Sequence, residues 1–75
     1  MESVRLLGTV LIWNAKRKFG FIRPDKPTSH GKDCFVHQSN VLPEFQDCVE
    51  AGRHVEFTPT ETEKGLSAFR VRIVA

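Results

Sequence analysis

Two short segments in the middle of the chain, eleven residues apart, alternate strictly between two kinds of side chain. The first, Lys18-Phe19-Gly20-Phe21-Ile22, sends its two phenylalanines to one face of a strand and its glycine and isoleucine to the other. The second, Cys34-Phe35-Val36-His37, sends its phenylalanine and histidine to one face and its cysteine and valine to the other. If the aliphatic face enters a core, three phenylalanines and a histidine stand together on the outside of a sheet.

Positive charge is concentrated in the same part of the chain. Between residues 14 and 32 a single acid, Asp25, faces Lys16, Arg17, Lys18, Arg23, Lys26 and Lys32, whereas acids outnumber cations between residues 40 and 65. Exposed rings on a sheet are suited to stacking on unpaired bases, and neighbouring cations are suited to contacts with phosphates. The overlap of rings and cations therefore favours an anionic, base-bearing ligand, such as single-stranded RNA or DNA.

The remaining segments also predict strands. A chain of 75 residues with 40% hydrophobic side chains makes one domain, and no segment has ten or more residues of helical periodicity. The expected strands cover about 4–15, 18–23, 33–38, 54–60 and 68–74, with a loop at 25–32 and a hairpin turn at 63–65. Five short antiparallel strands fit a small barrel, which leaves no exposed sheet edge. We therefore expect an all-β, five-stranded oligonucleotide-binding (OB) barrel.

Side-chain alternation predicts which residues of the first and last strands face the core. In the first strand we expect Val10 and Ile12 to point inward, with Trp13 outward beside the rings. In the last strand Phe69, Val71 and Ile73 share the expected inner side, opposite two outward, solubilising arginines. Phe45 falls in the irregular connection between the third and fourth strands, where partial exposure is expected.

These residues resemble the cold-shock domain family from Gly8 to about Val74. The two ribonucleoprotein-type motifs of that family correspond to Lys18-Phe19-Gly20-Phe21-Ile22 and Phe35-Val36-His37-Gln38-Ser39, in the family's order and spacing. Gln38, where many bacterial members carry a phenylalanine, is similar to the Y-box and Lin28-type branch. The resemblance implies an OB-fold barrel that binds single-stranded RNA or DNA and serves as an RNA chaperone or post-transcriptional regulator of gene expression.

Three residues depart from the family's pattern. Ile12 stands at the usual tryptophan position, Leu11 replaces a lysine, and Lys18 stands where the family prefers glycine. We expect the binding mode to persist with altered affinity, because one stacking ring is replaced by an aliphatic side chain.

The expected nucleic-acid-binding residues come from the two motifs and their flanks. They are Trp13, Asn14, Lys16, Arg17, Lys18, Phe19, Phe21, Arg23, Phe35, His37, Gln38 and Phe45. Several alternatives stay open at this point. The rings could be core residues, Trp13 could close the barrel end, and Phe45 could cover the core. The whole barrel could instead be a protein-interaction module with an aromatic face, or one domain of a longer chain.

The sequence also indicates what the protein does not use. No nucleophile lies beside a plausible base and no glycine-rich phosphate loop is present, so we expect no enzyme, small-molecule substrate or cofactor. The spacings of His30, His37, His54, Cys34 and Cys48 fit no usual zinc pattern, so no metal is expected. Cys34 is expected to be a buried free thiol. With no signal peptide in Met1–Arg5 and no membrane-spanning run, a cytoplasmic or nuclear location is expected.

Overall fold

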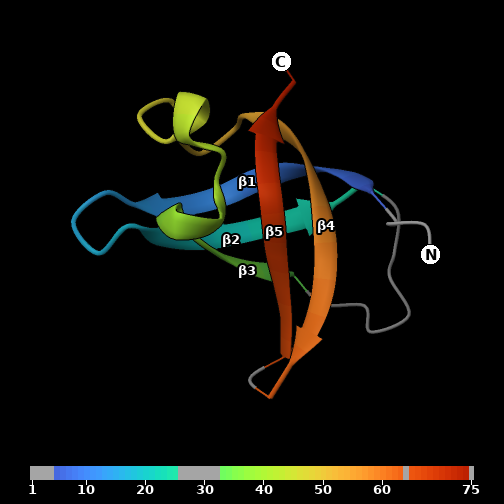
Figure 1. Ribbon diagram of the computed structural model, residues 1–75. Helices are drawn as coiled ribbons and strands as arrows, with labels where there is room; N and C mark the ends of the chain where they lie inside the picture. The colour runs from blue at the N-terminus through green and yellow to red at the C-terminus, as the bar shows by residue number, and fades with distance from the viewer. Residues whose placement is uncertain (1–4, 26–32, 64, 75) are drawn as a thin grey trace.

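The computed structural model describes residues 5–25, 33–63 and 65–74, and it contains strands and short 3₁₀ helices (Figure 1). In chain order the elements are β1 (Leu6–Asn14), β2 (Phe19–Pro24), β3 (Cys34–His37), η1 (Gln38–Asn40), η2 (Pro43–Phe45), β4 (His54–Thr62) and β5 (Gly65–Ile73). The β4–β5 hairpin is longer on both sides of its turn than the sequence predicted. Most of the loop expected at 25–32, together with Val4 and Lys64, lies outside the described residues.

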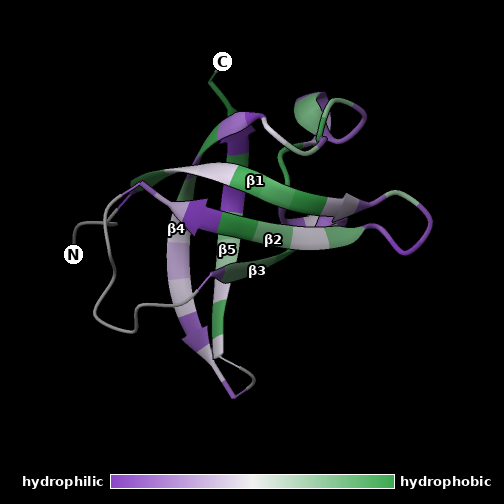
Figure 2. Ribbon diagram, turned by 180° about the vertical axis from the view of Figure 1, so that it is seen from behind, coloured by the Kyte–Doolittle hydropathy of each residue, from purple (hydrophilic) through white to green (hydrophobic). Residues whose placement is uncertain are grey.

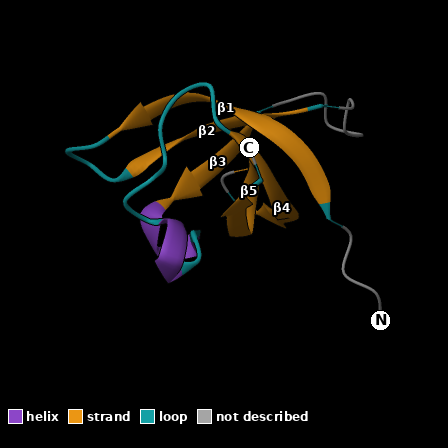
Figure 3. Cartoon of the chain, turned by 90° about the horizontal axis from the view of Figure 1, so that it is seen from above, coloured by secondary structure: helices purple, strands orange, loops and turns teal. Residues whose placement is uncertain are grey.

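The five strands form a closed barrel in the order β1-β2-β3-β5-β4, which confirms the expected architecture. Four of the neighbouring pairs are antiparallel, but β3 and β5 are parallel, with Phe35 opposite Ser67. The expectation of a wholly antiparallel barrel was therefore wrong at this one contact. The connection through η1 and η2 leads to β4, which pairs with β1, so β5 returns beside β3 in the same direction. Figure 3 shows β1, β2 and β3 side by side, with the helical segment following β3.

The barrel is filled by small and branched apolar side chains. The buried set comprises Val10, Ile22, Cys34, Val36, Val41, Val49, Val55, Phe57, Ala68 and Val71. The inward positions predicted for β2 and β3 are thus confirmed, and apolar residues colour much of β1 and β2 in Figure 2. Cys34 is a free thiol inside this core. Burial, and to a lesser extent the charge of Asp33, raises the pKa of the Cys34 thiol above its usual 9.0.

A β-bulge in β1 reverses the facing that alternation predicted. Val10 pairs with Ile22, but the next pair joins Ile12 to Phe21, so Leu11 is an extra residue in the strand. Ile12 is consequently 57% exposed, where an inward position was expected. Trp13 is half-buried and packs against the core, where an outward position beside the rings was expected. Both expectations failed for the same reason, because one inserted residue inverts every side chain after it.

A second bulge lies in β5, at Arg70. Glu56 of β4 pairs with Arg72 and Thr58 pairs with Phe69, so β5 carries one more residue than β4 across this interval. Arg70 has a φ of 53°, in the left-handed region. Ala68 and Val71 are therefore both buried, three residues apart, and Phe69 is only half-buried. The expectation that Phe69 and Val71 share the inner side was wrong.

Candidate nucleic-acid interface

Three phenylalanines form one cluster on the outer face of β2 and β3. The register places Phe19 opposite His37 and Phe21 opposite Phe35. The ring centroids of Phe19 and Phe35 are 5.7 Å apart at 31°, and those of Phe21 and Phe35 are 5.8 Å apart at 73°. All three rings are half-buried, and His37 is exposed. These four side chains, which we call the ring face, occupy the side of the sheet that the sequence predicted.

The absence of a side chain at Gly20 allows Trp13 to pack closely against the core side of the same sheet. A Cβ atom built on Gly20 would lie 2.9 Å from Cε3 of Trp13, closer than real side chains approach. Trp13 and Gly20 are also register partners, so the indole packs against the sheet on the side away from the ring face. A glycine is required here because the carbonyl oxygen of Ile12 and, beyond it, the Trp13 ring occupy the space that any side chain would need.

Ile12 extends the row of outward side chains from β1 across to β3. It is the register partner of Phe21, which is the partner of Phe35, so the three lie side by side on one face. Sequence reasoning left Ile12 out of the site because it was expected in the core. The resemblance to the cold-shock family carried the missing signal, since Ile12 stands at the position of a stacking tryptophan.

The turn between β1 and β2 carries three consecutive cations. The Asn14 side-chain oxygen Oδ1 accepts hydrogen bonds from the backbone N–H groups of Lys16 (3.1 Å) and Arg17 (3.0 Å). The Lys18 N–H donates to the Asn14 carbonyl at 2.7 Å and closes the turn. All four residues are exposed, and the turn is hydrophilic in Figure 2. Asn14, which was expected among the nucleic-acid-binding residues, therefore has its side-chain oxygen engaged in shaping the turn, while its NH₂ group makes neither of these bonds.

Lys18 adopts a left-handed backbone conformation with φ of 61°. Its carbonyl accepts a hydrogen bond of 2.8 Å from the N–H of Gln38, at the start of η1. The turn geometry is thus the one that a glycine adopts most readily, and the lysine retains it at a cost of about 1–2 kcal/mol. The side chain of Lys18 places a positive charge beside Phe19, at the edge of the ring face.

The tautomer of His37 is fixed by the residue two positions later. The backbone N–H of Ser39 donates to Nδ1 of His37 at 3.1 Å, and the Ser39 Oγ lies 2.9 Å from the same nitrogen. Because Nδ1 accepts, the neutral imidazole carries its proton on Nε2. The exposed ring therefore presents an N–H donor to a ligand. Sequence reasoning missed this role of Ser39, which only the backbone geometry of η1 reveals.

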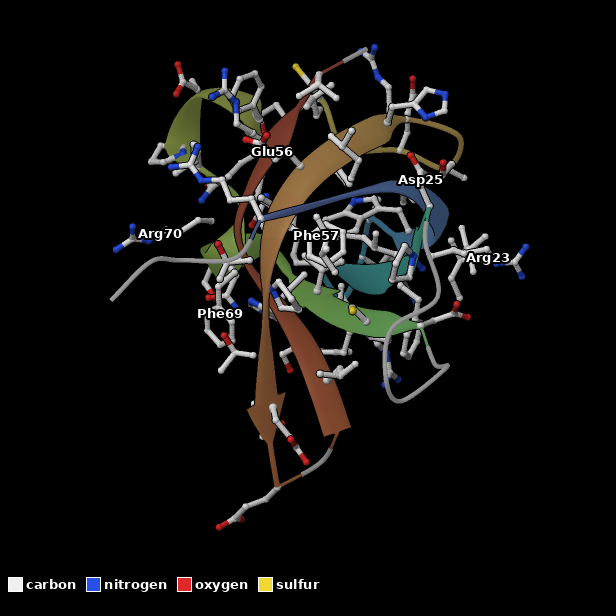
Figure 4. All side chains as sticks on the ribbon, turned by 90° about the vertical axis from the view of Figure 1, so that its right-hand side faces the viewer. Arg23, Asp25, Glu56, Phe57, Phe69 and Arg70 are labelled. Atoms are coloured by element: carbon white, nitrogen blue, oxygen red, sulfur yellow. The ribbon has the colours of Figure 1, made fainter. Side chains whose placement is uncertain are left out.

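The remaining predicted residues differ in how exposed they are to solvent. Arg23 is exposed at the end of β2, with Nε 3.9 Å from Oδ1 of Asp33, and it points away from the barrel in Figure 4. Gln38 is half-buried. Phe45 is half-buried and packs against the core from η2, which is the alternative that the sequence left open. The structure thus gathers the rings of β2 and β3 with the turn cations, and it sets Trp13 and Phe45 against the core.

Other kinds of site receive no support within the described residues. No group of three or more histidine, cysteine or acidic side chains comes together there in a way that could hold a metal ion. The two helices of the described ranges have three residues each, far short of the length needed to cross a membrane.

Comparison with known proteins identifies the family. The sequence model of the "Cold-shock" DNA-binding domain matches residues 6–74. The chain belongs to the cold-shock domain family. The cold-shock protein CapB of Pseudomonas syringae is 33% identical over 96% of this chain and 99% of its own length. Protein lin-28 homolog B of Homo sapiens is 38% identical over 93% of this chain and 30% of its own length.

A solved structure supports the same cold-shock fold. The Drosophila Unr CSD456 structure superposes with a TM-score of 0.76 at 26% identity, and the match covers 97% of this chain and 28% of that one. The chain thus spans nearly the whole of the bacterial relatives but less than a third of lin-28 homolog B and of the Unr structure. Cold-shock domain proteins generally bind nucleic acids and act like RNA chaperones, and they are not enzymes.

Proposed function

We propose that this cold-shock domain binds single-stranded nucleic acid, RNA in the cell and also single-stranded DNA, by stacking bases on the ring face. The observation that supports this most directly is the contact of Phe19, Phe21 and Phe35 on one outer surface, beside the exposed ring of His37. The hydrophobic effect does not favour gathering these rings outside a core, whereas every base has a flat surface that can stack on them.

In this proposal the turn cations and Arg23 neutralise backbone phosphates at the border of the ring face. Lys16, Arg17 and Lys18 are exposed in the turn that leads directly into Phe19. Phosphate contacts hold a strand in position without selecting its sequence. The exposed Nε2–H of His37 and the NH₂ groups of Asn14 and Gln38 would add hydrogen bonds to bases. We therefore expect a broad preference among single strands.

Trp13 and Phe45 have a secondary role in the proposal. Both pack against the core, so we propose that they support the surface and contact a ligand only at their exposed edges. Holding bases apart from their pairing partners would make the domain an RNA chaperone or a post-transcriptional regulator. A cytoplasmic or nuclear location belongs to the same proposal, because the two cysteines are free thiols.

The decisive experiment replaces Phe19 and Phe35 together with alanine and measures the Kd for a short oligo-dT and oligo-rU. Each lost stacking contact removes about 1–3 kcal/mol, so the loss of two contacts should weaken binding at least about 30-fold. Phe69→Ala is the matched control, since it removes a half-buried ring from β5, outside the ring face. Unchanged affinity of the folded double variant would refute the proposal. Binding that persists and hardly responds to salt would indicate a protein partner instead.

A further inference from the structure

A second basic surface lies on the outside of β4 and β5, away from the ring face. It surrounds a cavity of about 300 Å³ lined by Arg5, Leu42, Glu56, Thr58, Arg70 and Arg72, with Phe57 beneath. Figure 4 shows Arg70 and Arg23 pointing away from one another on opposite sides of the barrel, with Phe57 between them. We call this surface the arginine pocket.

The charges of the arginine pocket are unbalanced. Three guanidinium groups surround one carboxylate, and that carboxylate, Oε1 of Glu56, lies 3.5 Å from Nη1 of Arg5. Within residues 5–25, 33–63 and 65–74, the side chains of Arg70 and Arg72 form no hydrogen bond or salt bridge, and both residues are exposed. Two guanidinium groups with all their donors available therefore face one cavity.

The bulge in β5 brings these two arginines to the same cavity. Arg70 is the additional residue between the Glu56–Arg72 and Thr58–Phe69 pairs, and its φ of 53° is unusual for a residue with a side chain. Both arginines line the cavity, whereas Val71 between them is buried in the core. From the sequence, these two arginines were expected to be solubilising charges only.

We propose that the arginine pocket binds phosphate groups of a nucleic-acid backbone, at a site separate from the ring face. Guanidinium groups bind phosphates through paired N–H donors. The one ring that lines the cavity, Phe57, is 1% exposed, so the pocket offers no exposed aromatic ring on which a base can stack. Contacts there would fix the backbone without reading bases. A nucleic acid is favoured over an acidic protein because the family's ligands are nucleic acids.

The inference goes beyond the stacking function, because it assigns a ligand to a surface that has no stacking ring. A single strand long enough to pass around the barrel, or two segments of one folded RNA, would occupy the ring face and the arginine pocket together. A strand that covers only the ring face would leave the pocket empty. Strand length therefore separates the two sites.

The experiment compares wild type with the Arg70→Gln/Arg72→Gln variant on oligo-dT of about six nucleotides, near the lower end of the site sizes known for OB folds, and of about twenty, beyond their upper end. Affinities are measured between about 50 and 200 mM salt. For the long strand, loss of two phosphate contacts should reduce the log–log salt slope by about 1.4, so wild type should weaken about sevenfold more than the variant. Binding of the short strand should not change.

Two matched controls accompany the double variant. Glu56→Gln should raise the affinity for the long strand more than Glu44→Gln, because only Glu56 lines the pocket. Glu44→Gln removes the same charge from η2. Arg72→Gln alone, in a regular part of β5, should give about half the change in slope.

Equal salt slopes for wild type and the folded double variant on the long strand would overturn the proposal. Equal loss on both strand lengths would also overturn it, because the arginines would then act through the ring face. In a third outcome, polyglutamate competes with a labelled long strand for the wild type but not for the double variant, and the two proteins have the same salt slope. That outcome would identify a protein-binding site and overturn the assignment to nucleic acid. If the short strand does not bind the wild-type protein, that result would refute the proposed stacking on the ring face and would leave the arginine-pocket proposal unaffected.

Discussion

Replacing Ile12 with tryptophan should strengthen the binding of single strands. Ile12 is 57% exposed and is the register partner of Phe21, whose ring contacts Phe35 edge-on. An indole at this position would continue the row of rings from β3 across β2 to β1. The side chain already faces solvent, so the larger ring displaces no core atom.

The size of the effect follows from one additional stacked base. Stacking contributes about 1–3 kcal/mol per base, which corresponds to a gain of about 5- to 140-fold in affinity. The gain should lie toward the lower limit if part of the indole is already covered by Phe21 in the unbound protein. Since the substitution adds no charge, the salt slope of binding should stay that of wild type.

Two assays measure the change. Competition against a labelled oligo-dT gives the Kd, and fluorescence reports whether the new indole is quenched by a base. Leu7→Trp is the control, because Leu7 is also in β1 and 52% exposed but pairs with Glu56 of β4, away from the ring face. If the folded Ile12→Trp variant binds no more tightly than wild type, or if Leu7→Trp gains as much, the ring row does not extend to β1.

Three further predictions concern the turn and the core. Lys18→Gly should raise the free energy of unfolding by about 1 kcal/mol because it relieves the left-handed backbone, while lowering the salt slope of binding by about 0.7; urea unfolding and titration test the two effects separately. Asn14→Ala should cost about 1 kcal/mol, since the Lys16 and Arg17 N–H groups lose their acceptor, whereas Asn14→Asp should keep most of that stability. Burial raises the pKa of Cys34, so its contribution to stability is complete below about pH 9 and falls at higher pH as the unfolded thiol ionises first. Urea unfolding from pH 7 to 10 should detect this fall in wild type and not in Cys34→Ala, and a fall of equal size in both would contradict the assignment.

The ring face and the barrel could be predicted because β2 and β3 keep strict alternation. Phe19, Phe21 and Phe35 face outward and Ile22 and Val36 face inward, as the two-residue period requires. Those two strands pair without a bulge, so the register of one fixes the facing of the other. Local pattern and tertiary structure agree there, and the aromatic part of the candidate site follows from the pattern alone.

The facing of β1 and β5 could not be predicted, because a bulge is a property of strand pairing. Leu11, Ile12 and Trp13 are all apolar, so no polar residue marks where alternation breaks in β1. In β5 the segment from Phe69 to Ile73 alternates regularly in sequence, and that regularity was misleading. Arg70 is the inserted residue, although arginine gives no local signal for a left-handed backbone.

The backbone of Lys18 has a consequence for how the site meets its ligand. Its N–H is hydrogen-bonded to Asn14 at the end of β1, and its carbonyl is hydrogen-bonded to Gln38 at the start of η1, directly after β3. The cationic turn and the segment that orients His37 are therefore both hydrogen-bonded to the backbone of one residue, Lys18, which couples their positions. A ligand would meet charges and a histidine that are already preorganised, and less of the binding free energy would be spent on ordering them.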